Sequence, residues 1–164
     1  MSEAGIKPGT HFTLYTTAGR PGLKELAVAY KEMAKKADII IDVEVVEAGR
    51  YFADMEYKAP FYIDNWGARQ TINGNLKQFY ITDGSNNCSS YSNPELDKIL
   101  LDAESETTFE KRKELYGKAM EIISDEAVSI IPYYKGWVIA FASSVKGVKA
   151  HPMEYLWVDR AWIK

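Results

Sequence analysis

Hydrophobic and polar positions near the amino terminus alternate in a way that predicts a strand, a helix and a second strand. Residues 11–17 alternate apolar Phe12 and Leu14 with polar neighbours, as a strand does. After a Gly-Arg-Pro-Gly turn, apolar residues recur every three or four positions over residues 23–37, which is typical of one face of an amphipathic helix. Residues 39–46 are rich in β-branched side chains and alternate again. This order predicts a βαβ unit with parallel strands, and therefore an α/β fold.

The next predicted elements, a short helix over residues 50–57 and a strand over residues 60–63, lead into a loop that holds Trp66 and Arg69. In open α/β sheets, ligands bind in crevices at the carboxyl ends of the strands. The guanidinium of Arg69 can bind a carboxylate through two hydrogen bonds, and Trp66 offers an apolar ring face. Both residues are therefore candidate ligand contacts. Weaker candidates come from the same rim: Tyr62, Asn65, Tyr91 and Asn87.

The rest of the chain is predicted to hold a loop, two helices and two strands. Residues 71–92 are polar, and we predict a long surface loop with one helical turn around residues 76–80. Asn93 is expected to cap the first helix, with Pro94 at its first position. The second helix is expected to start with a capping box and to carry one arginine that extends to solvent or pairs with a glutamate. The residues concerned are Thr107, Glu110 and Arg112, and the two strands are predicted at residues 129–134 and 137–142.

Composition and residue spacing argue against catalysis. The 164 residues fit one domain, and a net charge of −3 without a basic stripe gives no sign of nucleic-acid binding. Cys88 is the only cysteine and the two histidines are far apart, so no metal-ligand spacing is present. Neither a glycine-rich phosphate loop nor a glycine elbow around a serine occurs. We therefore expect no enzyme activity, no metal and no cofactor. The apolar runs are too short to span a bilayer.

An ordered set of short motifs resembles the family 5 extracellular solute-binding proteins, the oligopeptide, dipeptide, nickel and opine receptors of ABC importers. The motifs are residues 3–6 before Gly9, and residues 66–69, 91–97, 111–116, 130–133 and 145–148. The resemblance covers essentially the whole chain. It implies the type 2 periplasmic-binding-protein fold, which has two α/β lobes, a hinge and a ligand between them.

Family members are much longer than this chain, so the resemblance implies a truncated second lobe. Residues 1–142 would form the ligand-binding lobe, and residues 143–164 would be a tail returning to a first lobe. Ala4 and Gly5 resemble the end of a helix that has no helix before it, which fits a truncated chain. The implied function is solute capture by hinge closure, followed by delivery to a membrane permease. The implied location is the periplasm, or the cell exterior with a membrane anchor.

Arg69 departs from the family pattern. In peptide-binding members an acidic residue near this position takes the amino terminus of the ligand, so an arginine favours a ligand with a carboxylate or another anionic group. One alternative is that Arg69 pairs internally with Asp64 and never meets a ligand. A second is a small cytosolic α/β enzyme or regulatory module that binds an anion through Arg69. A third is a lobe that has no affinity of its own and self-associates through exposed apolar residues: Trp157, Trp162 and Ile163.

Overall fold

The computed structural model describes residues 5–136, 138–151, 153 and 155–164. The chain divides into two compact units, one ending at Trp66 and the other beginning at Gly67, and each has its own hydrophobic core. Of the predicted helix end, Ala4 lies outside the described residues, while Gly5 has the left-handed backbone (φ 66°) common at such ends. The expected division at residues 142 and 143 stays a prediction.

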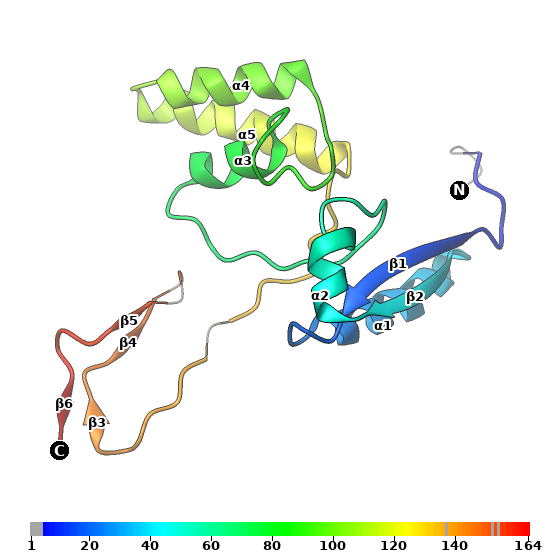
Figure 1. The fold of residues 1–164 in the computed structure, drawn as a ribbon. Coiled ribbons are helices and arrows are strands. Elements are labelled where there is room, and N and C mark those ends of the chain that lie inside the picture. Colours follow the sequence, from blue (N-terminus) through cyan, green and yellow to red (C-terminus); the bar gives the residue numbers. More distant parts are fainter. Residues whose placement is uncertain (1–4, 137, 152, 154) are drawn as a thin grey trace. The chain divides into compact units, whose positions relative to one another are not determined.

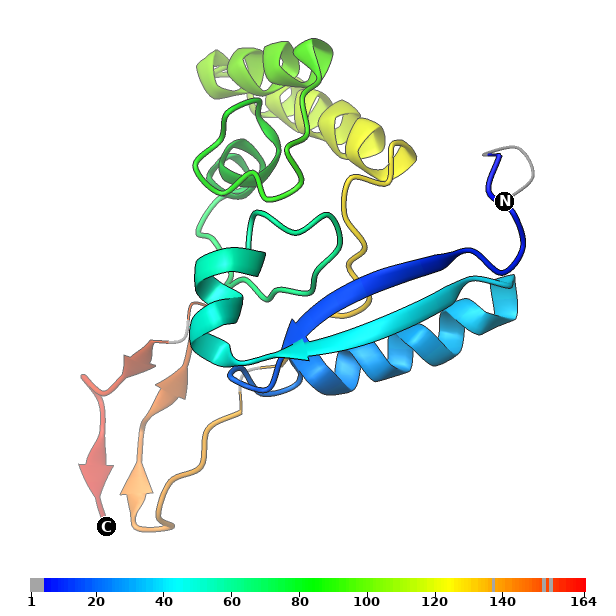
Figure 2. The same cartoon turned by 45° about the vertical axis from the view of Figure 1, so that its right-hand side comes forward.

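The first unit is built on the predicted βαβ motif. Its strands β1 (His11–Thr17) and β2 (Ile40–Val46) are parallel, with His11 opposite Ile40. Helix α1 (Leu23–Ala34) connects them and continues into the 3₁₀ turn η1 (Lys35–Ala37). Figures 1 and 2 show α1 lying along one face of the two strands. Leu14, Ala27 and Ile41 are buried between helix and strands, which confirms the α/β prediction. The predicted apolar face of the helix is buried only in part, because Met33 is 67 % exposed.

The predicted strand at residues 60–63 is reduced to a single parallel bridge between Tyr62 and Tyr15. Tyr15 donates its N–H to the Phe61 carbonyl and accepts the N–H of Ile63, both at 3.1 Å. Strand β1 therefore lies between β2 and this bridge. The predicted short helix is present as α2 (Ala48–Arg50) followed by the π-helical turn η2 (Tyr51–Met55).

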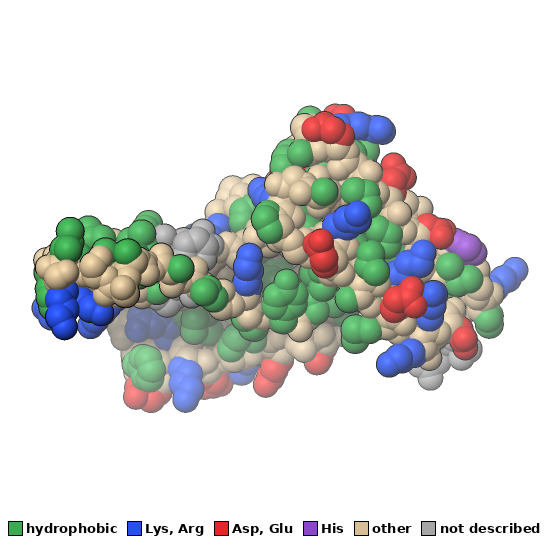
Figure 3. Space-filling model, turned by 90° about the horizontal axis from the view of Figure 1, so that it is seen from below, with side chains coloured by type: hydrophobic (Ala, Val, Ile, Leu, Met, Phe, Trp, Pro, Cys, Tyr) green, Lys and Arg blue, Asp and Glu red, His purple; other side chains and the backbone are tan. Residues whose placement is uncertain are grey.

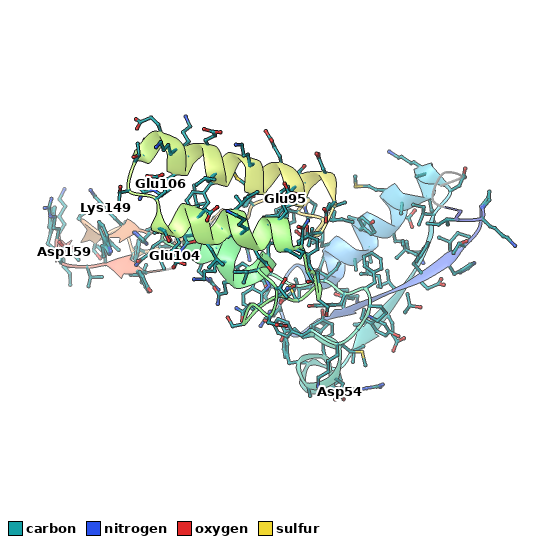
Figure 4. The ribbon with its side chains drawn as sticks, turned by 90° about the horizontal axis from the view of Figure 1, so that it is seen from above. Asp54, Glu95, Glu104, Glu106, Lys149 and Asp159 are labelled. Carbon is teal, nitrogen blue, oxygen red and sulfur yellow. The ribbon has the colours of Figure 1, made fainter. Side chains whose placement is uncertain are left out.

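Three helices lie in the described residues of the second unit. They are α3 (Ile72–Tyr80), α4 (Pro94–Ser105) and α5 (Phe109–Asp125), and Figure 1 shows α4 and α5 side by side. Their shared core consists of Leu76, Leu96, Leu100, Ala103, Tyr116 and Ala119. The carboxylate of Glu104, at the end of α4, binds Lys77 at 2.5 Å and Asn73 at 3.4 Å on α3 (Figure 4).

The prediction of a single helical turn around residues 76–80 was too short. Helix α3 begins after Thr71, whose hydroxyl accepts the N–H of Gly74 at 3.0 Å. Leu76 and Phe79 lie three positions apart and are both buried. A capping threonine and this spacing are helix signals, but the polar composition of residues 71–92 hid them.

The two long helices start differently. As predicted, the Asn93 side chain caps α4 by accepting the N–H groups of Glu95 and Leu96 at 2.9 and 3.2 Å. The predicted capping box of Thr107 and Glu110 is wrong. Helix α5 starts one residue later, at an N-cap Thr108 whose side chain makes no capping bond. The Glu106 side chain instead accepts the Thr108 N–H at 2.7 Å, so a carboxylate that precedes the helix binds the N–H of the N-cap residue in place of a capping box. Arg112 donates to the Glu106 carbonyl at 3.3 Å rather than to a carboxylate.

Removal of the N-cap side chain should destabilise the two helices to different extents. Asn93→Ala is expected to lower the free energy of unfolding by about 1 kcal/mol, because two helix N–H groups lose their acceptor. Thr108→Ala should cost much less, since its hydroxyl caps nothing. Urea denaturation followed by far-UV circular dichroism measures both. Equal losses in the two variants would contradict this account of the caps.

The strands predicted at residues 129–134 and 137–142 are also wrong. Trp137 lies outside the described residues; the others form no ladder with any strand in the described part of the chain. Apolar, β-branched composition favours a strand, but a strand forms only where a partner supplies hydrogen bonds. The segment exposes several large apolar side chains: Ile130, Ile131, Tyr133, Tyr134, Val138 and Phe141.

The carboxyl-terminal residues form short antiparallel ladders. Strand β3 (Val145–Lys146) pairs with β6 (Trp162–Ile163), and β4 (Lys149–Ala150) pairs with β5 (Leu156–Trp157). Trp157, Trp162 and Ile163 are all exposed. Figure 3 shows hydrophobic side chains interspersed with charged ones on one face of the molecule. Among the described residues, every helix falls short of the length and apolarity that a membrane crossing requires.

Candidate ligand-binding site

Trp66 is the last residue of the first unit and packs against a second aromatic ring. Its indole meets Tyr57 edge to face, with ring centroids 6.0 Å apart and an interplanar angle of 62°. This geometry is favourable for aromatic pairs and restricts the orientation of the indole. Trp66 is 40 % exposed, so part of the ring surface is accessible to solvent.

Arg69 is held by residues of the second unit. Its Nε donates to Oε1 of Gln78 at 2.7 Å, and its Nη1 donates to the Gly67 carbonyl at 2.9 Å. The guanidinium carbon lies 5.3 Å from the centroid of the Phe79 ring, within the range of a cation–π contact. Because Gln78 and Phe79 are neighbours on α3, this helix fixes the direction of the guanidinium. Asp64, the partner considered for Arg69 in the sequence, binds Arg20 within the first unit.

A charged cluster at the carboxyl end of β1 was not predicted. Nη1 of Arg20 binds the carboxylates of both Glu56 (3.2 Å) and Asp64, and its guanidinium lies over Phe52 at 4.6 Å. The Asp64 and Glu56 side chains are only 6 % and 12 % exposed. Burial, together with the negative charge of Glu56, raises the pKa of Asp64 to about 6. Burial also raises the pKa of Tyr51, and the Asp64 charge adds to that shift.

Two of the weaker candidates, Asn87 and Tyr91, form hydrogen bonds that stabilise the loop between α3 and α4. The Asn87 amide donates to the carbonyls of Ile81 and Tyr91 at 3.0 and 2.7 Å, and its Oδ1 accepts the Tyr91 N–H at 3.1 Å. The Tyr91 hydroxyl donates to the Glu126 carboxylate at 2.6 Å and accepts from Asn93 at 3.1 Å. Burial, followed by the Glu126 contact, raises the pKa of Tyr91. Asn87 and Tyr91 therefore stabilise the structure of the second unit.

The six candidates are divided between the units. Tyr62, Asn65 and Trp66 belong to the first, and Arg69, Asn87 and Tyr91 to the second. Asn65 is exposed and donates its backbone N–H to Asp64 at 2.7 Å, which connects it to the charged cluster. Two surface hollows of about 230 and 220 Å³ involve none of the six; the first is lined by Gly147, Lys149, Trp157, Asp159 and Arg160. Within the described ranges, His, Cys, Asp and Glu side chains form no group placed to hold a metal ion.

Comparisons with known proteins show what the chain is similar to. No family model matches. The chain is 27 % identical to the periplasmic oligopeptide-binding protein OppA of Salmonella typhimurium, over 99 % of the chain and 31 % of OppA. It is 26 % identical to the oligopeptide-binding protein AppA of Bacillus subtilis, over 93 % of the chain and 29 % of AppA. The nickel-binding protein NikA of Staphylococcus aureus is also 26 % identical, over 89 % of the chain and 30 % of NikA. The chain is related to the family 5 solute-binding proteins.

Solved structures of such solute-binding proteins show the same fold. The B. subtilis AppA structure, in complex with a nonapeptide, matches 94 % of the chain with a TM-score of 0.76 and 21 % identity. S. aureus NikA, in complex with Ni(L-His)2, matches 99 % with a TM-score of 0.73 and 20 % identity. The chain spans about a third of the length of these solute-binding proteins. The relatives are binding proteins rather than enzymes. The fold predicted from the sequence, that of a periplasmic binding protein, is confirmed.

Proposed function

We propose that this chain is the second lobe of a solute-binding protein of an ABC importer, which captures its ligand between lobes and does not transform it. The observation that carries the proposal is the sequence similarity to OppA over 99 % of the chain. In this proposal residues 1–142 are the ligand-binding lobe and residues 143–164 return to a first lobe. The rival, a small cytosolic enzyme or regulatory module that binds an anion, is not favoured because the relatives are receptors.

We further propose that Trp66 and Arg69 contact the ligand, with Tyr62, Asn65, Tyr91 and Asn87 as lesser contributors. Gln78 and Gly67 orient the Arg69 guanidinium, so less side-chain freedom is lost when it binds a carboxylate. A charge-assisted pair gains strength in a closed cleft from which water is excluded. These points support a ligand whose carboxylate, or another anionic group, faces this lobe.

The remaining parts of the proposal follow from the class of receptor. The loaded receptor would deliver its ligand to a membrane permease, in the periplasm or outside the cell on a membrane anchor, without a cofactor or enzyme activity. The exposed apolar side chains at the carboxyl-terminal ladders would favour self-association of the chain on its own. Sedimentation at high protein concentration measures this, and a clean monomer would contradict it.

Calorimetry on a receptor containing both lobes tests the role of Arg69. The probes are short peptides and the same peptides with the carboxyl terminus converted to an amide. We expect Arg69→Ala to weaken binding of the free-carboxylate peptides by about tenfold or more, or about 1.4 kcal/mol, and to reduce the preference over the amides. Arg50→Ala is the matched control, because Arg50 is an exposed arginine outside the proposed site.

The outcomes separate the two parts of the proposal. Unchanged affinity and unchanged carboxylate preference in Arg69→Ala would remove Arg69 from the site and leave solute binding intact. Failure of the unaltered receptor to bind any peptide or metal complex would count against solute binding itself.

A further inference from the structure

The charged cluster of Arg20, Glu56 and Asp64 has an imbalance of charge. One guanidinium faces two carboxylates that are nearly buried, so full ionisation leaves an excess negative charge in a place with little water. A buried carboxylate without compensation is costly. The groups that face Asp64 are Arg20, Glu56 and Tyr51, and the backbone N–H of Asn65.

Hydrogen bonds account for only one of the two Asp64 oxygens. Oδ1 accepts from Arg20 and from the Asn65 N–H, whereas Oδ2 is buried and has no donor among the described residues. The nearby Tyr51 hydroxyl donates to the Ile63 carbonyl. The Glu56 carboxylate accepts from the same Nη1 of Arg20, which holds the two carboxyls near each other. A proton on either carboxyl would supply the missing donor and remove the excess charge together.

We propose that Asp64 and Glu56 share one proton. This proton links Glu56, at the end of η2, to Asp64, which lies between Tyr62 and Trp66. The resulting arrangement is neutral, with one guanidinium, one carboxylate and one carboxylic acid. Two carboxyls that bind the same guanidinium nitrogen and share a proton titrate as a pair rather than separately. The rise of the Asp64 pKa to about 6 agrees with this arrangement.

The shared proton also acts on the aromatic pair described above. The Glu56 N–H donates to the Tyr51 carbonyl at 2.9 Å and ends η2. The next residue, Tyr57, has a left-handed backbone (φ 64°), which is uncommon for a residue with a large side chain and must be held by its surroundings. Its ring packs on Trp66, two residues beyond Asp64. Loss of the proton would leave two negative carboxylates, Glu56 and Asp64, on either side of Tyr57, and they would repel each other.

The sign of the pH dependence follows from the raised pKa. The unfolded chain binds the proton only below about pH 4, whereas the folded chain holds it up to about pH 6. The folded chain therefore binds more protons between these values, and its stability falls as the pH rises through this window. The turn that carries Tyr57 is held below about pH 6 and loosens above it.

Carbon-13 NMR of the side-chain carboxyls tests the proposal on the 164-residue chain. In the unaltered chain, we expect one carboxyl of the pair to titrate with a midpoint near pH 6. In Glu56→Gln, the Asp64 midpoint should fall, because the negative charge that helps to raise the pKa of Asp64 is gone. Asp54→Asn is the matched control, since Asp54 is an exposed carboxylate in the same helical turn (Figure 4).

The unaltered chain alone can overturn the proposal, so it remains testable if a variant fails to fold. An Asp64 midpoint below about pH 4.5, close to that of an ordinary carboxyl, would refute a shared proton. An Asp64 midpoint that is the same with and without Glu56→Gln would refute the coupling. Neither result bears on solute binding, which rests on other residues.

Discussion

Replacement of Leu100 by alanine should lower the free energy of unfolding of the second unit by about 3 kcal/mol. Leu100 lies on α4 and is fully buried in the core that α4 shares with α3 and α5. Loss of the side chain removes apolar surface from this core and leaves a cavity that the three helices can close only in part. Urea denaturation followed by far-UV circular dichroism gives the change.

Leu101→Ala is the matched control for this measurement. Leu101 is the next residue on the same helix but is 49 % exposed, so the same substitution should cost well under half as much. If both variants lost equal stability, the assignment of the buried face of α4 would be wrong.

Replacement of Arg20 by glutamine should have a large effect that depends on pH. At pH 8 we expect a loss of about 2 kcal/mol, because two nearly buried carboxylates lose their positive partner; the partial exposure of Arg20 keeps the loss below that of a fully buried pair. The Arg20 charge lowers the pKa of Asp64, so its removal lets the folded chain hold the proton to a higher pH. The loss should therefore be smaller at pH 5.

Urea midpoints at pH 8 and pH 5 measure this difference for the unaltered chain, Arg20→Gln and Arg50→Gln. Arg50 is exposed on α2 and lies outside the cluster, so Arg50→Gln should behave like the unaltered chain at both values. A loss in Arg20→Gln that is the same at pH 5 and pH 8 would show that the guanidinium acts through packing on Phe52 rather than through charge.

The parts of the fold that the sequence predicts well are those decided by nearby residues. The alternation of β1, the helical spacing of α1 and the Asn93 cap each depend on spacings of a few residues, and the structure agrees with all three. The strands predicted at residues 129–134 and 137–142 required partners from elsewhere, which composition does not reveal.

The candidate site shows the same limit more sharply. The position of Trp66 and Arg69 after a predicted strand made them candidates, and both remain so. The partner of Arg69 was missed because Gln78 lies on α3, which was predicted as only one turn. Arg20 is 44 residues from Asp64 and 36 from Glu56, and a single sequence contains no signal for contacts at such distances.

The hydrogen bonds of Asn87, in the loop between α3 and α4, have a consequence for protein production. Asn87, Cys88 and Ser89 form an acceptor sequence for N-linked glycosylation. In the folded chain both amide hydrogens are engaged, since the nitrogen donates to the Ile81 and Tyr91 carbonyls. A sugar attached before folding would replace one of these hydrogens and remove one of the two bonds. A bacterial host, or a eukaryotic one with Ser89 replaced by alanine, leaves this nitrogen unmodified.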